Sequence, residues 1–392
     1  MPGFAPVDPK QSFPELEERV LARWREQDLF ARTLAARAEA PIWSFYEGPP
    51  TANGRPGSHH VLARVFKDIY PRYRTMRGYR VPRKAGWDCH GLPVELEVER
   101  QLGISSKQEI EELGIAEFNR RCRESVFEYV EEWNRLTERI GFWVDLDDPY
   151  VTLEDRYIES VWWSLRRLWD KGSLYEGHKV VPYCPRCGTA LSSHEVAQGY
   201  EDVKDPSIYV RFPLLGESGE EAGESLLVWT TTPWTLPGNV GVAANPAVDY
   251  VRARRGGEVL IVAATLAERV LGEDAEVLDR LAGSELVGRR YRGPVFELAD
   301  GGPQGAVTAP FLVVAGDFVT TEDGTGLVHI APAFGEDDYG AAAAAGLFDP
   351  TARTTLYNPV TPEGTFDDRV VGFAGEFVKG SETTRRLIED LD

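Results

Sequence analysis

EGPPTANGRPGSHH, residues 47–60, is the stretch around which the rest of the chain is organised. A β-prone run precedes it at residues 43–46, and apolar residues recur after it at helical spacing from Val61 to Tyr70. Ser58 is a good candidate for the N-cap of that helix. A strand, a glycine-bearing loop and a helix N-terminus form a phosphate-binding device, because free N–H groups and the positive end of the helix dipole point out of the loop.

A second β-prone piece, Tyr79 to Pro82, follows the predicted helix. It leads into GWDCHGLP, residues 86–93. Strand, helix and strand in this order make a βαβ unit. The sequence therefore predicts a nucleotide-binding α/β domain.

Three segments resemble the class I aminoacyl-tRNA synthetases: PPTANG at 49–54, RTMRGY at 74–79, and GWD with HGLP between 86 and 93. The match is long and ungapped, and it is more similar to the isoleucine-specific members than to the valine or leucine ones. One departure falls at its centre, because the family signature His-Ile-Gly-His corresponds here to Gly-Ser-His-His at residues 57–60. Cys89 also stands where threonine is usual.

The resemblance implies a fold, a set of substrates and a set of site residues. The fold class is α/β, the first half of a class I Rossmann-like nucleotide-binding domain with an inserted β-rich editing domain. We expect residues 1–40 to be an N-terminal helical extension, 41–198 the half-domain with a zinc-knuckle half-site, and 199–392 the editing domain.

The implied substrates are isoleucine, ATP with Mg, and tRNA(Ile), and we expect a monomer. The implied residues are Gly57, Ser58, His59 and His60 for catalysis, Asn53, His59 and His60 for ATP, and Gly48, Pro49 and Asp88 for the amino acid.

The composition describes an ordinary globular protein with an unusual charge. Of the 392 residues, 42% are hydrophobic and 27% charged, which predicts two or three domains. No apolar run approaches membrane-spanning length and no signal region is present, so we expect a cytoplasmic protein. The net charge of −20 opposes tRNA binding, yet eight basic residues stand against one acid between Val61 and Ala85. This run is either a solvated helix face or a local field for ATP or the tRNA acceptor end, and we favour the second.

CPRC, residues 184–187, looks like half of a zinc knuckle. A tetrahedral structural zinc needs four ligands, and this pair supplies two. Cys89 and Cys122 fall in unrelated predicted elements, and His194 is a weakly suggested third ligand. A redox pair and coincidence are the alternatives. In the family a second Cys-x-x-Cys follows beyond the inserted domain, so we expect Cys184 and Cys187 to form an incomplete zinc site.

From about Gly199 the pattern changes to short β-prone runs separated by Gly/Glu loops, which predicts a compact β-rich domain. Two stretches in it have candidate chemistry, WTTTPWTLPGN at 229–239 and GTGLVHIAPAFGEDD at 324–338. β-propensity explains the threonines equally well, and the dipole of a helix starting near Glu336 explains the acids. The resemblance implies instead an editing pocket, in which Asp338 holds the α-ammonium group of misactivated valine. Its residues are Thr230, Thr231, Thr232, Thr235, Asn239, His329 and Asp338.

Three further helices are predicted around these motifs. Residues 12–30 carry an apolar face behind a capping box. Apolar spacing over residues 118–140 favours one long helix. A third helix, starting near residue 155, carries Trp162 and Trp169, which we expect to lie in the core.

The resemblance implies ATP-dependent ligation of isoleucine to tRNA(Ile), with hydrolytic editing of mischarged valyl-tRNA. The family's Lys-Met-Ser-Lys-Ser loop has no counterpart, since the methionines are Met1 and Met76, so we expect an N-terminal fragment. The first alternative is a stand-alone editing hydrolase acting on misacylated tRNA, but a hydrolase needs neither of the segments 49–54 and 86–92. The second is a non-catalytic tRNA-binding module, which the net charge disfavours.

Overall fold

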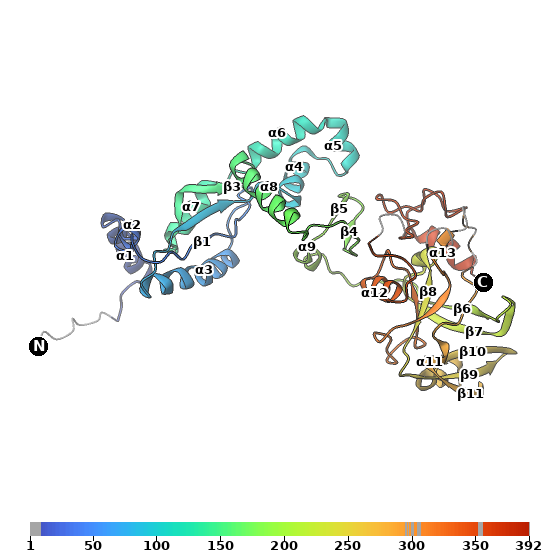
Figure 1. Ribbon diagram of the computed structural model, residues 1–392. Helices are drawn as coiled ribbons and strands as arrows, with labels where there is room; N and C mark the ends of the chain where they lie inside the picture. Colours follow the sequence, from blue (N-terminus) through green and yellow to red (C-terminus); the bar gives the residue numbers. More distant parts are fainter. Residues whose placement is uncertain are drawn as a thin grey trace, which may run out of the picture. The chain divides into compact units, whose positions relative to one another are not determined.

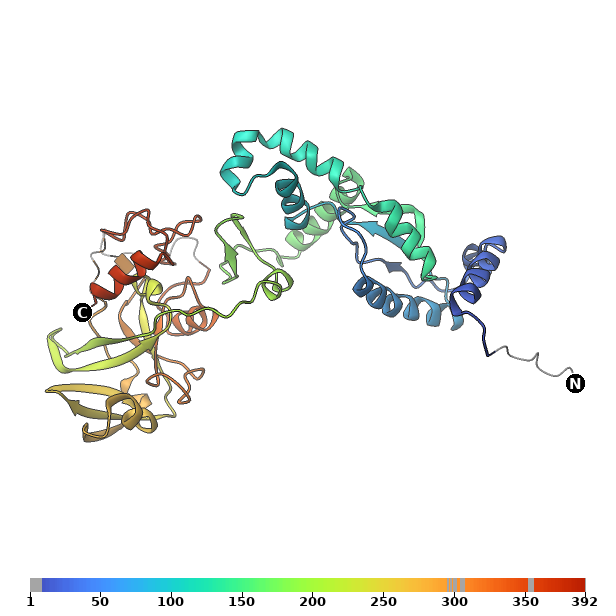
Figure 2. The same cartoon turned by 180° about the vertical axis from the view of Figure 1, so that it is seen from behind.

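The chain divides into two compact units, Met1–Leu174 and Tyr175–Asp392. The computed structural model describes residues 9–294, 296, 298, 302–303, 307–351 and 356–391, so residues 1–8 of the predicted N-terminal extension lie outside the described part. Figures 1 and 2 show the helices of the first unit and the strands of the second from two sides. Within the described ranges, no helix is long and apolar enough to cross a membrane.

The first unit combines helices with a small parallel sheet. Its strands are β1 (Phe45–Tyr46), β2 (Arg83–Trp87) and β3 (Asp145–Val151), hydrogen-bonded in the order β1-β2-β3. Its helices are α1 (Phe13–Glu26), α2 (Leu29–Ala35), α3 (Ser58–Met76), α4 (Leu92–Leu102), α5 (Lys107–Leu113), α6 (Ile115–Ser125), α7 (Val130–Arg139) and α8 (Asp155–Asp170).

The order of the strands decides where the connecting helices lie. Crossovers between parallel strands are right-handed, so two successive crossovers in the same direction place α3 and α7 on one face of the sheet. The Arg64 guanidinium of α3 accordingly lies 5.0 Å from the ring centroid of Trp133 in α7. The core beneath these helices contains Trp87, Trp133 and Val151. The predicted strand–loop–helix–strand unit is therefore present.

The structure corrects several predicted boundaries in this unit. The helix predicted over 12–30 is two helices, because Asp28 adopts a left-handed conformation with φ 47° between α1 and α2, and the capping bond predicted for its first residue is not made. The second strand begins at Arg83, four residues later than predicted. The long helix predicted over 118–140 is broken into α6 and α7, where the Tyr129 N–H donates to the Ala52 carbonyl.

The prediction that the tryptophans of α8 lie in the core is wrong for this chain. Trp162 is 67% exposed and Trp169 63%, and α8 has no buried residue. Helix α3 also presents a row of exposed apolar side chains at helical spacing, made of Leu62, Val65, Phe66, Ile69, Tyr70 and Tyr73. The periodic pattern predicted an apolar face correctly in both helices, but not that the face is uncovered here.

The second unit is rich in β-strands, as predicted. Its strands are β4 (Tyr183–Cys184), β5 (Thr189–Ala190), β6 (Ile208–Leu215), β7 (Glu221–Thr230), β8 (Gly241–Ala244), β9 (Asp249–Arg255), β10 (Glu258–Ala263), β11 (Glu276–Ala282), β12 (Leu312–Ala315) and β13 (Leu327–Ile330). Its helices are α9 (Ser193–Ala197), α10 (Ala267–Leu271), α11 (Gly283–Leu286), α12 (Glu336–Ala344) and α13 (Ser381–Glu389), with 3₁₀ turns η1 (Pro233–Gly238) and η2 (Ala264–Leu266).

Two sheets enclose the main core of this unit. One has the order β11-β9-β10-β7-β6, and the other the order β12-β8-β13. Phe212 and Val228 from the first sheet pack in one apolar cluster with Val242, Val313 and Leu327 from the second. Helix α12 begins at Glu336, as predicted, directly after the loop that follows β13. The ends of β7 and β13 therefore lie on one well-packed frame.

Candidate functional site

The first candidate site lies at the start of α3. Gly57, not Ser58 as predicted, is the N-cap, and its N–H donates to His60 Nδ1 over 2.9 Å. A neutral His60 ring therefore carries its proton on Nε2, where it can be donated to a ligand oxygen. Burial lowers the pKa of His60, and electrostatic interaction with His59, Arg64 and Lys67 lowers it further. A neutral imidazole in this tautomer can donate from Nε2.

His59 occupies space that a side chain at residue 57 would need. A Cβ built on Gly57 would lie 2.8 Å from His59 Cε1, closer than real contacts allow. The His59 and His60 rings are 3.8 Å apart between centroids. A side chain at residue 57 would therefore require the exposed His59 ring to move.

The loop before α3 is anchored by three hydrogen bonds to two other segments, the start of α7 and the start of α4. Trp133 Nε1 donates to the Gly54 carbonyl over 2.9 Å, and Tyr129 N–H donates to the carbonyl of Ala52 over 2.9 Å. The side-chain NH₂ of Asn53 donates to the Pro93 carbonyl over 2.7 Å. The Asn53 side chain therefore holds the loop in place, and its predicted contact with ATP stays a prediction.

The predicted amino-acid residues meet at the carboxyl end of β2. Asp88 N–H donates to the Pro50 carbonyl over 3.0 Å, which joins Asp88 to the segment that carries Gly48 and Pro49. Asp88 Oδ1 lies 3.3 Å from its donor, the His90 N–H, and 3.5 Å from Thr152 Oγ1. Ligands of open α/β sheets bind outside the carboxyl ends of the strands, which is where this carboxylate is held.

Most of the basic run between residues 61 and 85 is paired within the unit. Its members are bonded to acids or hydroxyls of the same unit: Arg64 to Thr137, Lys67 to Glu47, Arg72 and Arg83 to Asp68, and Lys84 to Asp148. Burial lowers the pKa of Arg83 to about 10 although Asp68 opposes the shift. The preference for a field serving ATP or tRNA is therefore weakened, because these charges hold the unit together.

Cys184 and Cys187 lie in the hairpin formed by β4 and β5, in the second unit rather than with the nucleotide-binding half, although the predicted domain ranges themselves stay a prediction. The Cys187 N–H lies 3.4 Å from Cys184 Sγ. Throughout the described ranges no three His, Cys, Asp or Glu side chains gather into a metal-binding group. His194 instead lies 2.7 Å from Gln198 Nε2. The residues present do not fit a complete zinc site.

The second candidate site is a chain of threonine hydroxyls that ends on a buried histidine. Thr230 Oγ1, at the end of β7, lies 3.2 Å from Thr232 Oγ1, which lies 3.3 Å from Thr235 Oγ1 in η1. Thr235 Oγ1 lies 2.9 Å from Nε2 of His329 in β13. Two strands of different sheets thus bring together residues almost one hundred positions apart.

Thr235 decides which nitrogen of His329 carries the proton. Its hydroxyl donates to the Thr232 carbonyl over 2.8 Å, so it accepts from His329 Nε2–H. His329 is 6% exposed, and its Nδ1 has no hydrogen-bond partner among the described residues. Burial alone lowers the pKa of His329 to about 4. This imidazole is neutral and leaves an acceptor unpaired.

Asp338 lies in the first turn of α12 and is tied to the end of β13. Its Oδ2 accepts from the Ala331 N–H over 2.8 Å, two residues after His329. A Cβ built on Gly335 would lie 2.8 Å from Asp338 Cγ, so glycine at the N-cap leaves room for the carboxylate. Burial raises the pKa of Asp338 to about 6. An acid that only complements a helix dipole has no need to be buried in this way.

The two remaining residues predicted for the editing pocket, Thr231 and Asn239, are not hydrogen-bonded to the threonine–histidine group in the described part of the chain. Thr231 is exposed in the bend between β7 and η1. Asn239 is 1% exposed, and both ends of its amide are bonded, since Nδ2 donates to the Gly241 carbonyl over 2.9 Å and Oδ1 accepts from Tyr291 over 2.6 Å. Asn239 thus supports the end of η1 from within the fold.

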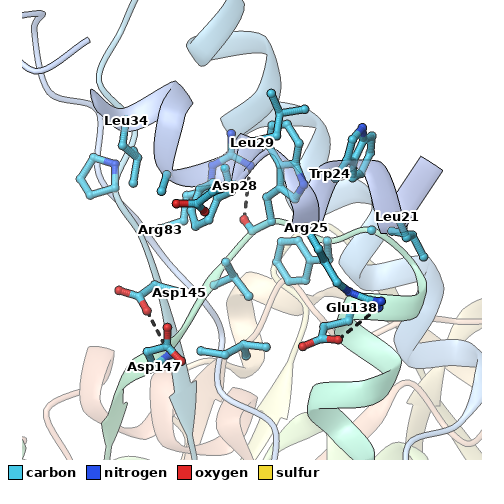
Figure 3. Close-up of a pocket in the computed structure, with 18 residues that line it drawn as sticks. Leu21, Trp24, Arg25, Asp28, Leu29, Leu34, Arg83, Glu138, Asp145 and Asp147 are labelled. Atoms are coloured by element: carbon cyan, nitrogen blue, oxygen red, sulfur yellow. Dashed lines mark hydrogen bonds and ion pairs between the residues drawn. The ribbon is translucent and has the colours of Figure 1, made fainter. Parts of the chain in front are cut away.

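A cavity of about 510 Å³ lies within the first unit (Figure 3). Trp24, Leu29 and Leu34 of helices α1 and α2 line one side, and Arg83 and Asp145 lie across from them. None of the predicted site residues lines it. The cavity therefore marks the seam between the N-terminal helices and the sheet.

Residues 19–355 match the family model described as tRNA synthetases class I (I, L, M and V). The chain belongs to this family, which confirms the resemblance and the α/β fold class with its β-rich second unit. The protein named isoleucine–tRNA ligase from Streptomyces coelicolor is 54% identical over the whole chain, and the one from Thermus thermophilus is 51% identical over 97% of it. The chain spans 36% and 35% of the lengths of these two relatives.

Among solved structures, the similarities are remote. GlLeuRS-CP1 covers 47% of this chain with 94% of its own length, at 16% identity and a TM-score of 0.34. The cytosolic leucyl-tRNA synthetase editing domain of P. knowlesi covers 36% of this chain with 63% of its own, at 15% identity and a TM-score of 0.28.

Proposed function

We propose that the chain contributes half of the activation site and the editing site of an isoleucine–tRNA ligase. Family membership and relatives of that name at about half identity support the proposal. The observation that carries the proposal is a direct hydrogen bond between the segments 49–54 and 86–93, from the Asp88 N–H to the Pro50 carbonyl. That bond places the acid at the end of β2 beside the loop that leads to His60.

In the proposed activation step, the isoleucine carboxylate attacks the α-phosphate of ATP, and pyrophosphate leaves. Asp88 would face the substrate's ammonium group, with Gly48 and Pro49 forming the adjacent wall. His60 Nε2–H, together with loop N–H groups and His59, would donate to phosphate oxygens as charge develops on them. A neutral donor suits this task, because it needs no deprotonation or rearrangement when the charge appears.

The activated isoleucine would then pass to tRNA(Ile), whose terminal ribose hydroxyl attacks the adenylate and displaces AMP. Mg²⁺ would accompany ATP and neutralise part of its charge. We place this activity in the cytoplasm and expect a monomer. Cys184 and Cys187 enter no step of the reaction.

Editing is needed because isoleucine and valine differ by one methylene. One methylene in an apolar pocket is worth only about 1–3 kcal/mol, a general value for which isoleucine against valine is itself the standard example. We propose that the hydroxyls of Thr230, Thr232 and Thr235 and the side chains of His329 and Asp338 hold a valyl ester for hydrolysis. Asp338 would bind its ammonium group, and a positioned water would attack the ester carbonyl.

Asp338→Ala tests this assignment in the full-length protein that contains the chain. Removing the carboxylate removes a charge-assisted hydrogen bond worth about 1.5–3 kcal/mol. Deacylation of pre-charged valyl-tRNA should fall by more than about tenfold, the lower end of that energy. Isoleucine-dependent ATP–pyrophosphate exchange should stay within about twofold, because the activation site lies in the other unit.

Asp337→Ala is the matched control, since Asp337 is an exposed acid in the same first turn. It should leave deacylation unchanged. Normal deacylation by Asp338→Ala would reduce Asp338 to a helix-end charge. Deacylation without any isoleucine-dependent exchange by the unaltered protein would favour the stand-alone hydrolase instead.

A further inference from the structure

A lysine in the middle of α3 is bonded to the start of the loop that carries the proposed amino-acid pocket. The Lys67 ammonium lies 2.7 Å from Glu47 Oε1 and 3.3 Å from the Gly48 carbonyl oxygen. Lys67 and the loop are twenty residues apart in sequence, so this contact belongs to the tertiary fold. Neither Glu47 nor Lys67 was singled out as a site residue from the sequence.

Glu47 is a buried acid that depends on this contact. It is 3% exposed, and its second carboxylate oxygen, Oε2, has no hydrogen-bond partner among the described residues. A buried carboxylate needs a counter-charge, which Lys67 supplies with a side chain that is 34% exposed. Arg64 is a second cation close enough for its charge to interact with Glu47, but its own hydrogen bond goes to Thr137.

Gly48 leaves space for the lysine. A Cβ built on Gly48 would lie 3.3 Å from Lys67 Nζ, and its backbone is outside the left-handed region. A side chain at residue 48 would require the Lys67 ammonium to shift by a few tenths of an ångström.

The backbone on either side of Pro49 is fixed by separate elements. Glu47 N–H donates to the Lys84 carbonyl over 2.9 Å, and Tyr150 of β3 donates its hydroxyl proton to the Glu47 carbonyl. Pro50 is held by Asp88, as described above. Lys67 adds a link from this loop to α3, the helix whose first turn carries His60.

We propose that Lys67 is a positioning residue that sets the placement of the amino-acid pocket relative to the phosphate-binding end of α3. The proposal rests on the proposed function for the identity of the two pockets. Nucleophile and phosphorus react efficiently only when they are held at about 3–3.5 Å in the correct orientation. A loop released from α3 loses the pocket wall formed by Gly48 and Pro49, while the Gly54 and Ala52 anchors at the helix end stay in place.

The first test measures the loop itself in the 392-residue chain. The double variant Lys67→Met/Glu47→Gln removes both charges, so no unpaired ion is left buried. Amide hydrogen exchange between residues 47 and 54 should become at least about tenfold faster, while exchange in β7 and β10 of the other unit stays unchanged. Arg77→Met, at the exposed end of α3, is the control and should change neither.

The second test measures isoleucine-dependent ATP–pyrophosphate exchange in the full-length protein. In the same double variant the KM for isoleucine should rise about tenfold, with the KM for ATP within about threefold. Lys67→Arg alone should keep the isoleucine KM close to that of the unaltered protein, because a guanidinium can still bridge the Glu47 carboxylate and the Gly48 carbonyl. An equal rise in both KM values, or no rise in either, would overturn the positioning role.

The two tests separate the two claims. If the unaltered protein shows no isoleucine-dependent exchange activity, the proposed function fails, and hydrogen exchange of the loop still decides whether Lys67 positions it. Unchanged amide exchange in the double variant overturns the inference even where ligase activity is present.

Discussion

His60 in the first unit and His329 in the second are both held neutral, but by different means and for different partners. Burial and three neighbouring basic side chains lower the pKa of His60, whereas burial alone lowers the pKa of His329 to about 4. Both rings carry their proton on Nε2. His60 accepts a backbone N–H on Nδ1 and carries its proton on Nε2, while His329 donates its Nε2 proton to Thr235 and keeps Nδ1 unpaired.

This contrast fits two different ligand chemistries. A ring that offers N–H suits the acceptor oxygens of a phosphate. A ring that offers a lone pair suits a ligand or water that donates. The same side chain in the same tautomer thus leaves a donor free in one unit and an acceptor free in the other, because a different nitrogen is hydrogen-bonded in each.

The largest expected effect is that of His60→Ala on activation. Removing one transition-state donor costs about 10²–10³-fold in rate, so isoleucine-dependent exchange by the full-length protein should fall by that amount. Valyl-tRNA deacylation should not change. His194→Ala, a histidine on the exposed side of α9, is the control. A loss below about threefold would move the donor role to His59 or to the loop N–H groups.

Thr235→Val should give the next largest effect, on the stability of the second unit. The change leaves the buried His329 Nε2–H without its acceptor, which costs about 1–3 kcal/mol. Urea unfolding of the chain would measure the loss, with the exposed Thr231→Val as control within about 0.5 kcal/mol. In the unaltered chain, ¹⁵N NMR of labelled histidine should detect the Nε2–H tautomer of His329. An Nδ1–H tautomer in the unaltered chain would contradict the contrast drawn above.

The smallest of the three effects is a pH dependence of editing. Asp338 has a pKa raised to about 6, so its carboxylate is protonated below that value and valyl-tRNA deacylation should fall about tenfold per pH unit. Asp338→Asn should remove this acid limb from the profile. A profile that is flat between pH 7 and about 5 would contradict the role of the carboxylate.

Asp338 and His329 affect the stability of the fold with opposite pH dependences. The folded pKa of Asp338 is above its ordinary value of 3.8, so its contribution stabilises the fold at low pH and is lost as pH rises through about 6. The folded pKa of His329 is below its ordinary value of 6.5, so its contribution is present above 6.5 and lost as pH falls through about 4. The two contributions largely offset each other in acid.

The local features of the fold were predictable from the sequence. Neighbouring residues determine the loop at 47–57, the helix α3 and the start of α12 at Glu336. Each of these was predicted in its observed place. The N-cap was misplaced by one residue, because the His60 ring accepts the Gly57 N–H, a bond that no N-cap pattern of small polar residues indicates.

Features that depend on distant contacts were not predictable. The break between α6 and α7 is stabilised by the bond from Tyr129 to Ala52, which lies in another part of the chain. Glu47 has no local signal that marks it as buried or paired, because its partner is reached through the fold. The threonine–histidine group was found through the resemblance, whereas periodicity alone explained those residues as strand and helix ends.

The uncovered face of α8 gives the chain an optical property. Three of its ten tryptophans, Trp162, Trp163 and Trp169, lie on this one helix, and each is more than 60% exposed. Indole in water emits at longer wavelength and is quenched by small solutes, while buried rings such as Trp87 and Trp133 are shielded. Intrinsic fluorescence with acrylamide quenching therefore reports directly on whether anything covers α8, without any label.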